Sequence, residues 1–216
     1  PTPEGSYCID STEVTQSQYA AFLASKPQVG AHGDSWCQAN NHGYEPKVQD
    51  DTGQGSCLPG AVDPTKKGDW PMVCVDWCDA HAYCAWAGKR LCGSRQGGAM
   101  KLTDDPASLQ SQWNYACTNG GTTKYTYGNE LDTTSCPSAT LGSTSEIGGC
   151  HGIGNPFSTI MGLTGNANEW EDNCDDAPIA RHCAIRFNNG NKPCAVIGDA
   201  TASESSTGTG FRCCAD

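Results

Sequence analysis

Four cysteines and one histidine lie within the twenty residues 73–92, a run that reads VCVDWCDAHAYCAWAGKRLC. Thiolates and imidazoles bind transition metals, reactive cysteines carry out redox chemistry, and cysteines also form structural disulfides. The run therefore raises three possibilities: a metal site, a redox site or a set of disulfide anchors. Its members are Cys74, Cys78, His81, Cys84 and Cys92.

The spacing of these residues argues against a structural zinc site. Cys78, His81 and Cys84 are three residues apart, so on a helix they share one side only approximately. Cys74 precedes this helix and Cys92 follows its end, so the five side chains leave in different directions. Structural zinc sites use paired Cys-x2-Cys knuckles whose ligands converge. We therefore interpret the run as a helix that is held by several disulfides.

A second set of candidate ligands lies in residues 164–176, which read TGNANEWEDNCDD. Six side chains with oxygen donors fall within eleven residues of this segment: Asn166, Glu169, Glu171, Asp172, Asp175 and Asp176. Calcium binds six to eight oxygens from carboxylates, amides and carbonyls, so this set suits calcium better than a softer metal. The segment lacks the spacing and the glycine of an EF-hand. The alternative interpretation is a solvated acidic loop without a metal.

The number of cysteines predicts where the protein works. A total of 15 in 216 residues is uncommon in the reducing cytosol unless the protein holds a metal cluster. We therefore predict an extracellular, periplasmic or cell-surface location for a secreted protein. The odd total leaves at least one thiol unpaired within the chain. Adjacent residues on a strand point to opposite sides, so of Cys213 and Cys214 we expect one to be structural and the other free.

Composition favours one loop-rich domain over residues 1–216. Glycine (26) and proline (12) are frequent, and charged residues make up only 17% of the chain. The formal charge of -11 repels phosphate backbones, which argues against general nucleic-acid binding. No apolar run reaches the length that a membrane-spanning helix needs.

Two helices are predicted from their capping residues. In the first, Thr15 is the N-cap and Gln18 completes a capping box. The second covers residues 77–87, between the N-cap Asp76 and the stop at Gly88.

Most of the remaining chain is expected to be loop. Residues 111–117 are predicted to form a short buried helix, and Phe211 and Arg212 to lie on a terminal strand. Residues 28–70 and 130–160 show little periodicity and are predicted as long loops, which are natural binding surfaces. No repeat of fixed period is present.

Several separated segments of the chain form a set of motifs. They are EVTQSQYA at 13–20, the run from Pro71 to Leu91, Trp113 with Ala116, Gly120 with Gly121, YGN at 127–129, Gly165 and Asn166 followed by Glu169 and Trp170, and GFRC at 210–213. Taken together, these motifs resemble the formylglycine-generating enzyme family, whose members are also called sulfatase-modifying factors. Each motif is weak alone, but their order is kept across nearly the whole chain.

This resemblance implies an α+β fold of the formylglycine-generating enzyme type, a variant of the C-type-lectin-like fold that is loop-rich and here stapled by disulfides. It also implies bound calcium, with ligands from the carbonyl of Thr164, the side chain of Asn166 and the carboxylate of Glu169. Asn168 stands where the family pattern has a tryptophan. The weaker candidate ligands are Asn168, Glu171 and Asp172.

The oxidases of the family bind copper(I) through two closely spaced cysteines and convert a substrate cysteine to formylglycine. In the corresponding region, between Arg186 and Gly210, this chain has only Cys194, so the expected pair is missing. Cys183 and Cys194 are weak candidates for a rearranged copper site, although two such cysteines in an oxidising compartment are more often joined in a disulfide. The five histidines show no His-x3-His pair that would suit the iron enzymes of the family.

Three functions stay open from the sequence. The first is a non-catalytic, calcium-stabilised extracellular or surface domain that binds a protein or glycan. The second is a copper-dependent oxidase that makes formylglycine. The third is a subunit of a fibre or coat that self-assembles through surface loops or an unpaired cysteine.

Tryptophans are candidates for stacking on sugars. Trp36 and Trp70 lie in predicted loops and are the two candidates for this role. Leu91 and four tryptophans lie within the family motifs and are expected in the core: Trp77, Trp86, Trp113 and Trp170.

Overall fold

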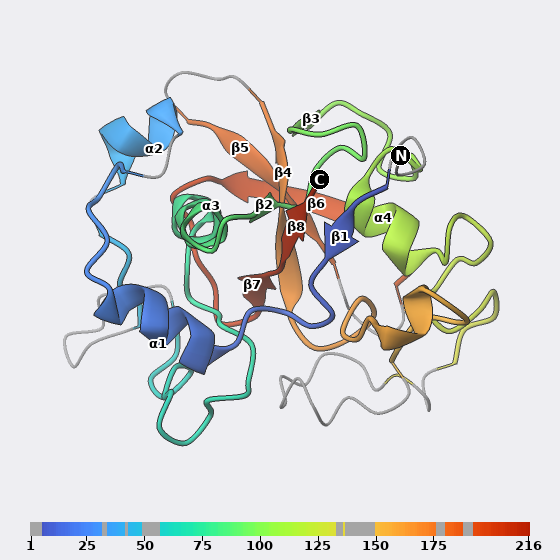
Figure 1. Cartoon of the computed structure of the whole chain (residues 1–216), viewed down its shortest axis with the longest axis horizontal. Helices are drawn as coiled ribbons and strands as arrows, with labels where there is room; N and C mark the ends of the chain where they lie inside the picture. The colour runs from blue at the N-terminus through green and yellow to red at the C-terminus, as the bar shows by residue number, and fades with distance from the viewer. Residues whose placement is uncertain are drawn as a thin grey trace.

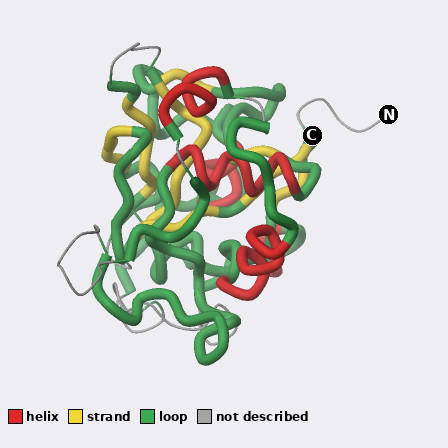
Figure 2. Tube along the Cα trace, turned by 90° about the vertical axis from the view of Figure 1, so that its left-hand side faces the viewer, coloured by secondary structure: helices red, strands yellow, loops and turns green. Residues whose placement is uncertain are grey.

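The computed structural model describes residues 6–31, 34–41, 43–48, 57–132, 136, 150–175, 180–187 and 192–216, and the structural statements below concern these residues. Loops and turns make up most of the described chain, as Figures 1 and 2 show. Helices and strands are short, and in chain order they are β1 (Cys8–Ile9), α1 (Gln16–Ala24), α2 (Ser35–Asn40), α3 (Trp77–Trp86), β2 (Arg90–Leu91), β3 (Met100–Lys101), α4 (Gln112–Cys117), the 3-10 helix η1 (Phe157–Thr159), β4 (Asn168–Cys174), β5 (His182–Arg186), β6 (Ile197–Thr201), β7 (Thr209–Phe211) and β8 (Cys213–Ala215).

Two small sheets organise these elements. The larger has the order β3-β4-β5-β6, with β7 also paired to β4. β4 is antiparallel to β5 and parallel to both β3 and β7, so it is the central strand. The smaller sheet has the antiparallel order β1-β8-β2. β7 and β8 follow each other closely in the chain, so residues 209–215 connect the two sheets (Figure 1).

The predicted capping residues are confirmed. At α1, Thr15 Oγ1 accepts from the Gln18 backbone N–H at 3.3 Å, and Gln18 Oε1 accepts from the Thr15 N–H at 2.8 Å. At α3, Asp76 caps the helix by accepting from the Asp79 N–H, and Gly88 follows the helix with a φ of +71°, which a residue with a side chain rarely adopts. The predicted short buried helix is α4.

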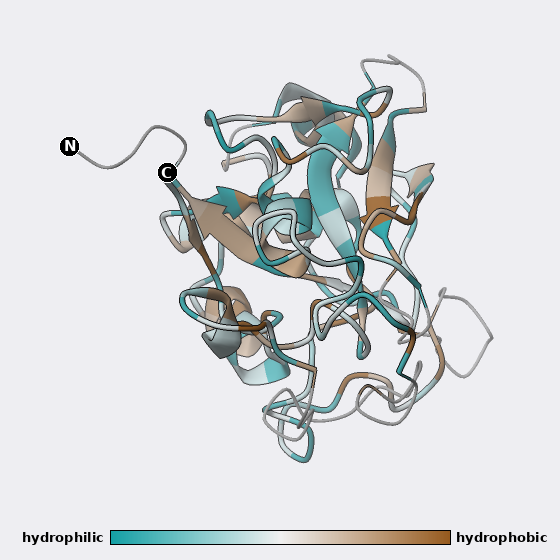
Figure 3. Cartoon of the chain, turned by 90° about the vertical axis from the view of Figure 1, so that its right-hand side faces the viewer, coloured by the Kyte–Doolittle hydropathy of each residue, from teal (hydrophilic) through white to brown (hydrophobic). Residues whose placement is uncertain are grey.

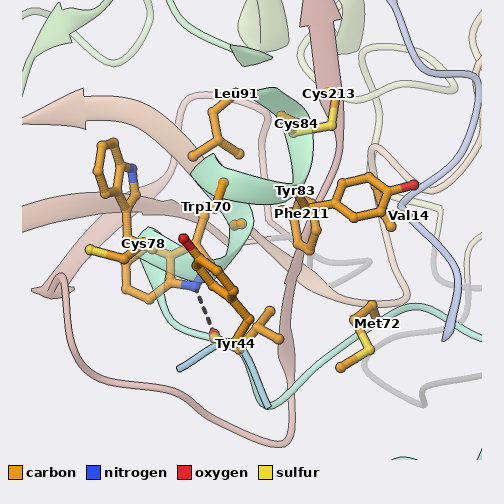
Figure 4. Packing of buried hydrophobic residues seen from close by; sticks show 14 of the residues in the cluster. Val14, Tyr44, Met72, Cys78, Tyr83, Cys84, Leu91, Trp170, Phe211 and Cys213 are labelled. Atoms are coloured by element: carbon orange, nitrogen blue, oxygen red, sulfur yellow. Dashed lines mark hydrogen bonds between the residues drawn. A yellow bond between two sulfur atoms is a disulfide. The ribbon is translucent and has the colours of Figure 1, made fainter. Parts of the chain in front are cut away.

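The main core packs α1 and α3 against the sheets. Trp170 from β4, Phe211 from β7 and Tyr83 from α3 are labelled in Figure 4, beside the disulfide between Cys84 and Cys213. The rings of Tyr83 and Phe211 meet edge to face with centroids 5.4 Å apart. The indole N–H of Trp170 donates to the Val75 carbonyl at 3.2 Å, so this buried polar group is satisfied.

Most expectations about the tryptophans are confirmed, and one is wrong. Trp77, Trp113 and Trp170 are buried, as is Leu91, but 38% of Trp86 is exposed because it lies at the last residue of α3. Trp36 lies on α2, so the region predicted as a loop at residues 28–70 contains a helix.

Residues 168–174 do not form the solvated acidic loop that was the alternative interpretation of this segment. Residues 168–174 form β4, the central strand of the larger sheet, and Glu169 and Glu171 on it are buried. Figure 3 shows strands in hydrophilic teal as well as in brown, so hydropathy does not separate strand from loop in this protein. The helices of the described chain include none that is long and apolar enough to cross a membrane.

Seven disulfides join cysteines that are between 9 and 129 residues apart in sequence. The four cysteines of residues 73–92 each bond to a different partner, so this run is a set of disulfide anchors rather than a metal or redox site. Both Cys213 and Cys214 are bonded, which makes the expectation that one of them is free wrong, and the free cysteine is the exposed Cys8. The pairs are Cys37–Cys78, Cys57–Cys74, Cys84–Cys213, Cys92–Cys214, Cys117–Cys194, Cys136–Cys150 and Cys174–Cys183.

Candidate functional site

The residues predicted to bind calcium lie at the start of β4. Thr164 and Asn166 belong to the turn before the strand, where Asn166 has a φ of +63°, and Glu169 is the second residue of the strand. Glu169 is fully buried. Its two carboxylate oxygens accept three hydrogen bonds of 2.8 to 3.0 Å from Arg212. Oε2 also accepts from the indole N–H of Trp113 at 2.8 Å.

A second carboxylate shares Arg212. Glu13 Oε2 lies 3.8 Å from Arg212 Nη2, and both side chains are fully buried. Gly162 closes over Glu13, because a Cβ at position 162 would lie 2.5 Å from Glu13 Oε2. Burial raises the pKa of Glu13 to about 7, with Arg212 opposing the rise and the charge of Glu169 adding to it. One guanidinium therefore neutralises one of the two carboxylates, and the raised pKa of Glu13 favours its protonated form.

Glu171 belongs to a separate buried ion pair. Its Oε2 accepts from Arg186 Nε at 3.0 Å, and its Oε1 accepts from the Ser111 hydroxyl at 3.2 Å. Burial raises the pKa of Glu171, although Arg186 opposes the rise. The guanidinium of Arg186 also lies 4.9 Å from the ring centroid of Trp113, the residue that donates to Glu169.

The carboxylate of Glu169 is engaged by hydrogen-bond donors. Arg212 donates to both of its oxygens, so a calcium ion bound to Glu169 would compete with this guanidinium. Glu171 is committed to Arg186 in the same way. Among the described residues, no three His, Cys, Asp or Glu side chains are grouped so that they could hold a metal ion.

Two of the weaker candidates, Asn168 and Asp172, lie on β4 as Glu169 does. Asp172 is half-buried on β4, and burial raises its pKa to about 6 against the opposing charges of Arg90 and Arg181. Asn168 is half-buried at the start of the strand. Asp176 lies outside the described residues. Calcium at this segment stays a prediction.

The two weak candidates for copper ligands are not paired with each other. Cys183 is bonded to Cys174 across the β4–β5 ladder, and Cys194 is bonded to Cys117 at the end of α4. All 15 cysteines lie within the described residues, and 14 of them are in disulfides. A cavity of about 360 Å3 is lined by Pro193 and Ala195, the residues on either side of Cys194, but the cysteine itself is 2% exposed.

The histidines of the described chain are engaged in separate places. His182 Nδ1 lies 2.8 Å from Asp199 Oδ2, and the ring of His81 stacks on Trp77 with centroids 4.9 Å apart. His151 Nδ1 lies 2.9 Å from the Gly152 carbonyl oxygen. His32 and His42 lie outside the described residues.

One cavity, lined mainly by aromatic and aliphatic side chains, was not predicted from the sequence. It has a volume of about 510 Å3 and lies between β1, α4 and η1, which are neighbours in Figure 1. Its walls include three aromatic rings and one cation, and also the free Cys8. The principal lining residues are Tyr7, Cys8, Arg95, Tyr115, Phe157 and Ile160.

The aromatic side chains of this cavity hold one another in place. The rings of Tyr7 and Tyr115 meet at 70° with centroids 6.2 Å apart, and those of Tyr115 and Phe157 at 63° and 5.8 Å. The Tyr7 hydroxyl donates to the Gln112 carbonyl at 2.5 Å. The guanidinium of Arg95 lies 3.7 Å from the ring centroid of Tyr115. The lining residues come from four separate parts of the sequence, and three of these parts lie outside the family motifs. No local pattern in the sequence therefore points to the cavity.

Comparisons with known proteins agree with the resemblance in the motifs. A search among curated proteins found no match. The crystal structure of CarF is 18% identical to this chain with a TM-score of 0.56, and the match covers 97% of this chain and 85% of CarF. The structure of PvdO from Pseudomonas aeruginosa is also 18% identical, with a TM-score of 0.57 over 97% of this chain and 80% of PvdO. At this identity the likeness shows a shared fold.

A protein-family model gives the family directly. The model described as the sulfatase-modifying factor enzyme 1-like domain matches residues 4–216. The predicted α+β fold of the formylglycine-generating enzyme type, stapled by disulfides, is confirmed by this match, the shared fold and the seven bonded pairs. The chain belongs to the sulfatase-modifying factor enzyme 1-like, or formylglycine-generating enzyme, family.

Proposed function

We propose that this protein is a non-catalytic member of its family that binds a protein or glycan outside the cytosol. The observation that supports this proposal best is the pairing of the cysteines. Fourteen of them are joined in disulfides, and the remaining one, Cys8, lies at the edge of the smaller sheet. A chain with seven disulfides suits an oxidising compartment, which supports an extracellular, periplasmic or cell-surface location.

The oxidase chemistry of the family needs two thiolates. Copper(I) is a soft ion that binds thiolate sulfur, and a cysteine in a disulfide supplies no thiolate. The region that corresponds to the copper site contains Cys194, which is bonded to Cys117, and both cysteines are buried. Cys8 alone cannot form a two-thiolate site.

The proposed ligand is a protein or a glycan rather than a nucleic acid. The net charge of -11 opposes binding to a phosphate backbone. Leu58, Leu131 and Ile153 are each more than half exposed, and they lie in the two regions that the sequence predicts as binding loops. Such side chains offer apolar contacts to a protein partner.

A copper(I) titration under anaerobic conditions tests this proposal. The protein competes for copper(I) with a chromophoric chelator, without added reductant that could open disulfides. The Cys8→Ser variant, which removes the free thiol and leaves the seven disulfides in place, is the matched control. The chelator is chosen so that it binds copper(I) more weakly than a two-thiolate site does. We expect the protein to take no copper(I) from this chelator.

The outcome in the variant separates the two functions. Stoichiometric, tight copper(I) binding that persists in Cys8→Ser would require a thiol pair that the structure places in a disulfide, and would favour the oxidase. Oxygen-dependent conversion of a peptide cysteine to formylglycine by the same sample would overturn the proposal.

A further inference from the structure

The cavity between β1, α4 and η1 has the properties of a small-molecule site. Its volume of about 510 Å3 lies within the range of roughly 300–1,000 Å3 that is typical of ligand clefts. Its walls combine aromatic and aliphatic surface with few polar groups, the usual composition of such a cleft. The ring contacts among Tyr7, Tyr115 and Phe157 fix the shape of the wall without a ligand.

Charge selects the kind of ligand. Arg95 is the one charged residue among the described residues that line the cavity, although the protein as a whole carries a net charge of -11. The cavity is therefore a local cationic site in an acidic protein, and it favours an anion over a cation.

The hydrogen bonds of Arg95 leave capacity for an anion. Its Nη1 donates to the Leu109 carbonyl at 3.2 Å, while its buried Nε finds no acceptor among the described residues. A guanidinium has five N–H donors, and a carboxylate can accept two of them side by side. The guanidinium lies over the ring of Tyr115, and this contact restricts its movement, which reduces the entropy lost on binding.

We propose that this cavity binds a small aromatic carboxylate, with its ring against Tyr7, Tyr115 and Phe157 and its carboxylate on Arg95. The proposal goes beyond the binding of a protein or glycan through surface loops, because it rests on the cavity alone. Cys8 lies on the same wall, so its thiol reports occupancy of the cavity.

The test uses 2-naphthoate as probe and two matched compounds, 2-naphthamide and acetate. The naphthamide keeps the rings but lacks the charge, and acetate keeps the charge but lacks the rings. We expect saturable one-to-one binding of 2-naphthoate by calorimetry, affinity at least about tenfold weaker for the amide, and no saturation with acetate, because a charge-assisted hydrogen bond accounts for about that factor. Saturating 2-naphthoate should also slow the alkylation of Cys8 by iodoacetamide, measured by mass spectrometry.

Two variants locate the binding. Arg95→Gln should weaken 2-naphthoate at least about tenfold and leave 2-naphthamide nearly unchanged. The control is Lys67→Gln, which removes another cation that lies over an aromatic ring, 5.0 Å from the centroid of Trp70, and it should leave both affinities unchanged.

Several results would overturn this assignment. They are the absence of 2-naphthoate binding to the parent protein, equal affinity for acid and amide, or a Cys8 alkylation rate that saturating probe does not change. If Arg95→Gln does not fold, the comparison of acid with amide on the parent protein and the protection of Cys8 decide the question. None of these results affects the copper(I) titration, so the cavity and the proposed function fail independently.

Discussion

At the scale of single residues, the buried charges around β4 determine how the protein responds to pH. Glu13, Glu169 and Arg212 form a cluster of two carboxylates and one guanidinium with no exposed surface. Three hydrogen bonds tie Arg212 to Glu169, while Glu13 lies at 3.8 Å. The cluster is balanced when Glu13 is protonated and carries one excess negative charge when Glu13 is ionised.

The first prediction concerns the stability of this cluster. In the folded protein the pKa of Glu13 is raised from 4.5 to about 7, so the folded state holds this proton more tightly than the unfolded chain does. Ionisation of Glu13 should therefore lower the free energy of unfolding as pH rises from about 4.5 to about 7, by on the order of 3 kcal/mol. The stabilising contribution is complete below the unfolded pKa and is lost above the folded one.

The Glu13→Gln variant isolates this effect from other titrating groups, such as Asp172. Glutamine resembles the protonated carboxyl, so the variant should match the parent protein at pH 5 and be more stable at pH 8. Urea unfolding without reductant, at several pH values, gives the difference. Parallel stability curves for the two proteins would contradict the raised pKa.

The second prediction concerns calcium at Glu169. Because Arg212 and Trp113 occupy both carboxylate oxygens, a calcium ion is not needed to satisfy this buried charge. We expect the melting temperature in EGTA to equal that in millimolar calcium chloride, with magnesium chloride as the control for ionic strength. A rise of several degrees in calcium alone would support the calcium site that the family resemblance implies.

At the scale of elements, α3 and its flanks are fixed by pairs of disulfides that act together. Cys84–Cys213 closes 129 residues and Cys92–Cys214 closes 122 residues, and the two bonds join neighbouring positions on both sides. While one bond is intact, the other closes an effective loop of only about ten residues. Removing a single bond therefore restores little conformational entropy to the unfolded chain.

The third prediction follows from this redundancy. Replacing either pair by alanines should lower the free energy of unfolding by about 3 kcal/mol. Replacing both should lower it by about 7 kcal/mol, more than the sum, because the last bond then closes a loop that Cys117–Cys194 limits to about 50 residues. Chemical unfolding of the two single-pair variants and of the combined variant measures the coupling. Strict additivity would show that the two bonds do not constrain the same loop.

The helices and the strands differ in how far the sequence predicts them. The starts of α1 and α3 follow from Thr15, Gln18 and Asp76, because a capping box lies within four residues and needs no distant partner. β4 could not be predicted as a buried strand, because the arginines that make Glu169 and Glu171 tolerable in the interior lie 43 and 15 residues away. The same limit applies to the cavity, whose lining comes together only in the folded chain.

Family motifs extended the prediction further than local patterns. They indicated the fold over the whole chain, and the family match over residues 4–216 confirms it. They did not reveal the disulfide partners. From the sequence, Cys183 and Cys194 were candidates for a pair, but they are bonded to Cys174 and Cys117. Pairing depends on which Cα atoms approach within bonding distance, and that is a property of the tertiary structure.

At the scale of the whole molecule, the cysteine network determines how copies can be joined. Cys8 is the free cysteine, it is exposed, and it lies on the edge strand β1. The fourth prediction is that any disulfide-linked assembly of this protein runs through Cys8. Non-reducing electrophoresis should therefore show only monomer for Cys8→Ser, whatever the parent protein shows, and a covalent ladder in the variant would refute it.

The proposed function requires that this member of the family keeps no pair of thiols. The most direct test is a count of free thiols after unfolding in denaturant without reductant, with peptide mapping to locate them. We predict one free thiol, at Cys8, and none in Cys8→Ser. Two or more free thiols in the parent protein, located at Cys117, Cys183 or Cys194, would contradict it and restore the copper oxidase.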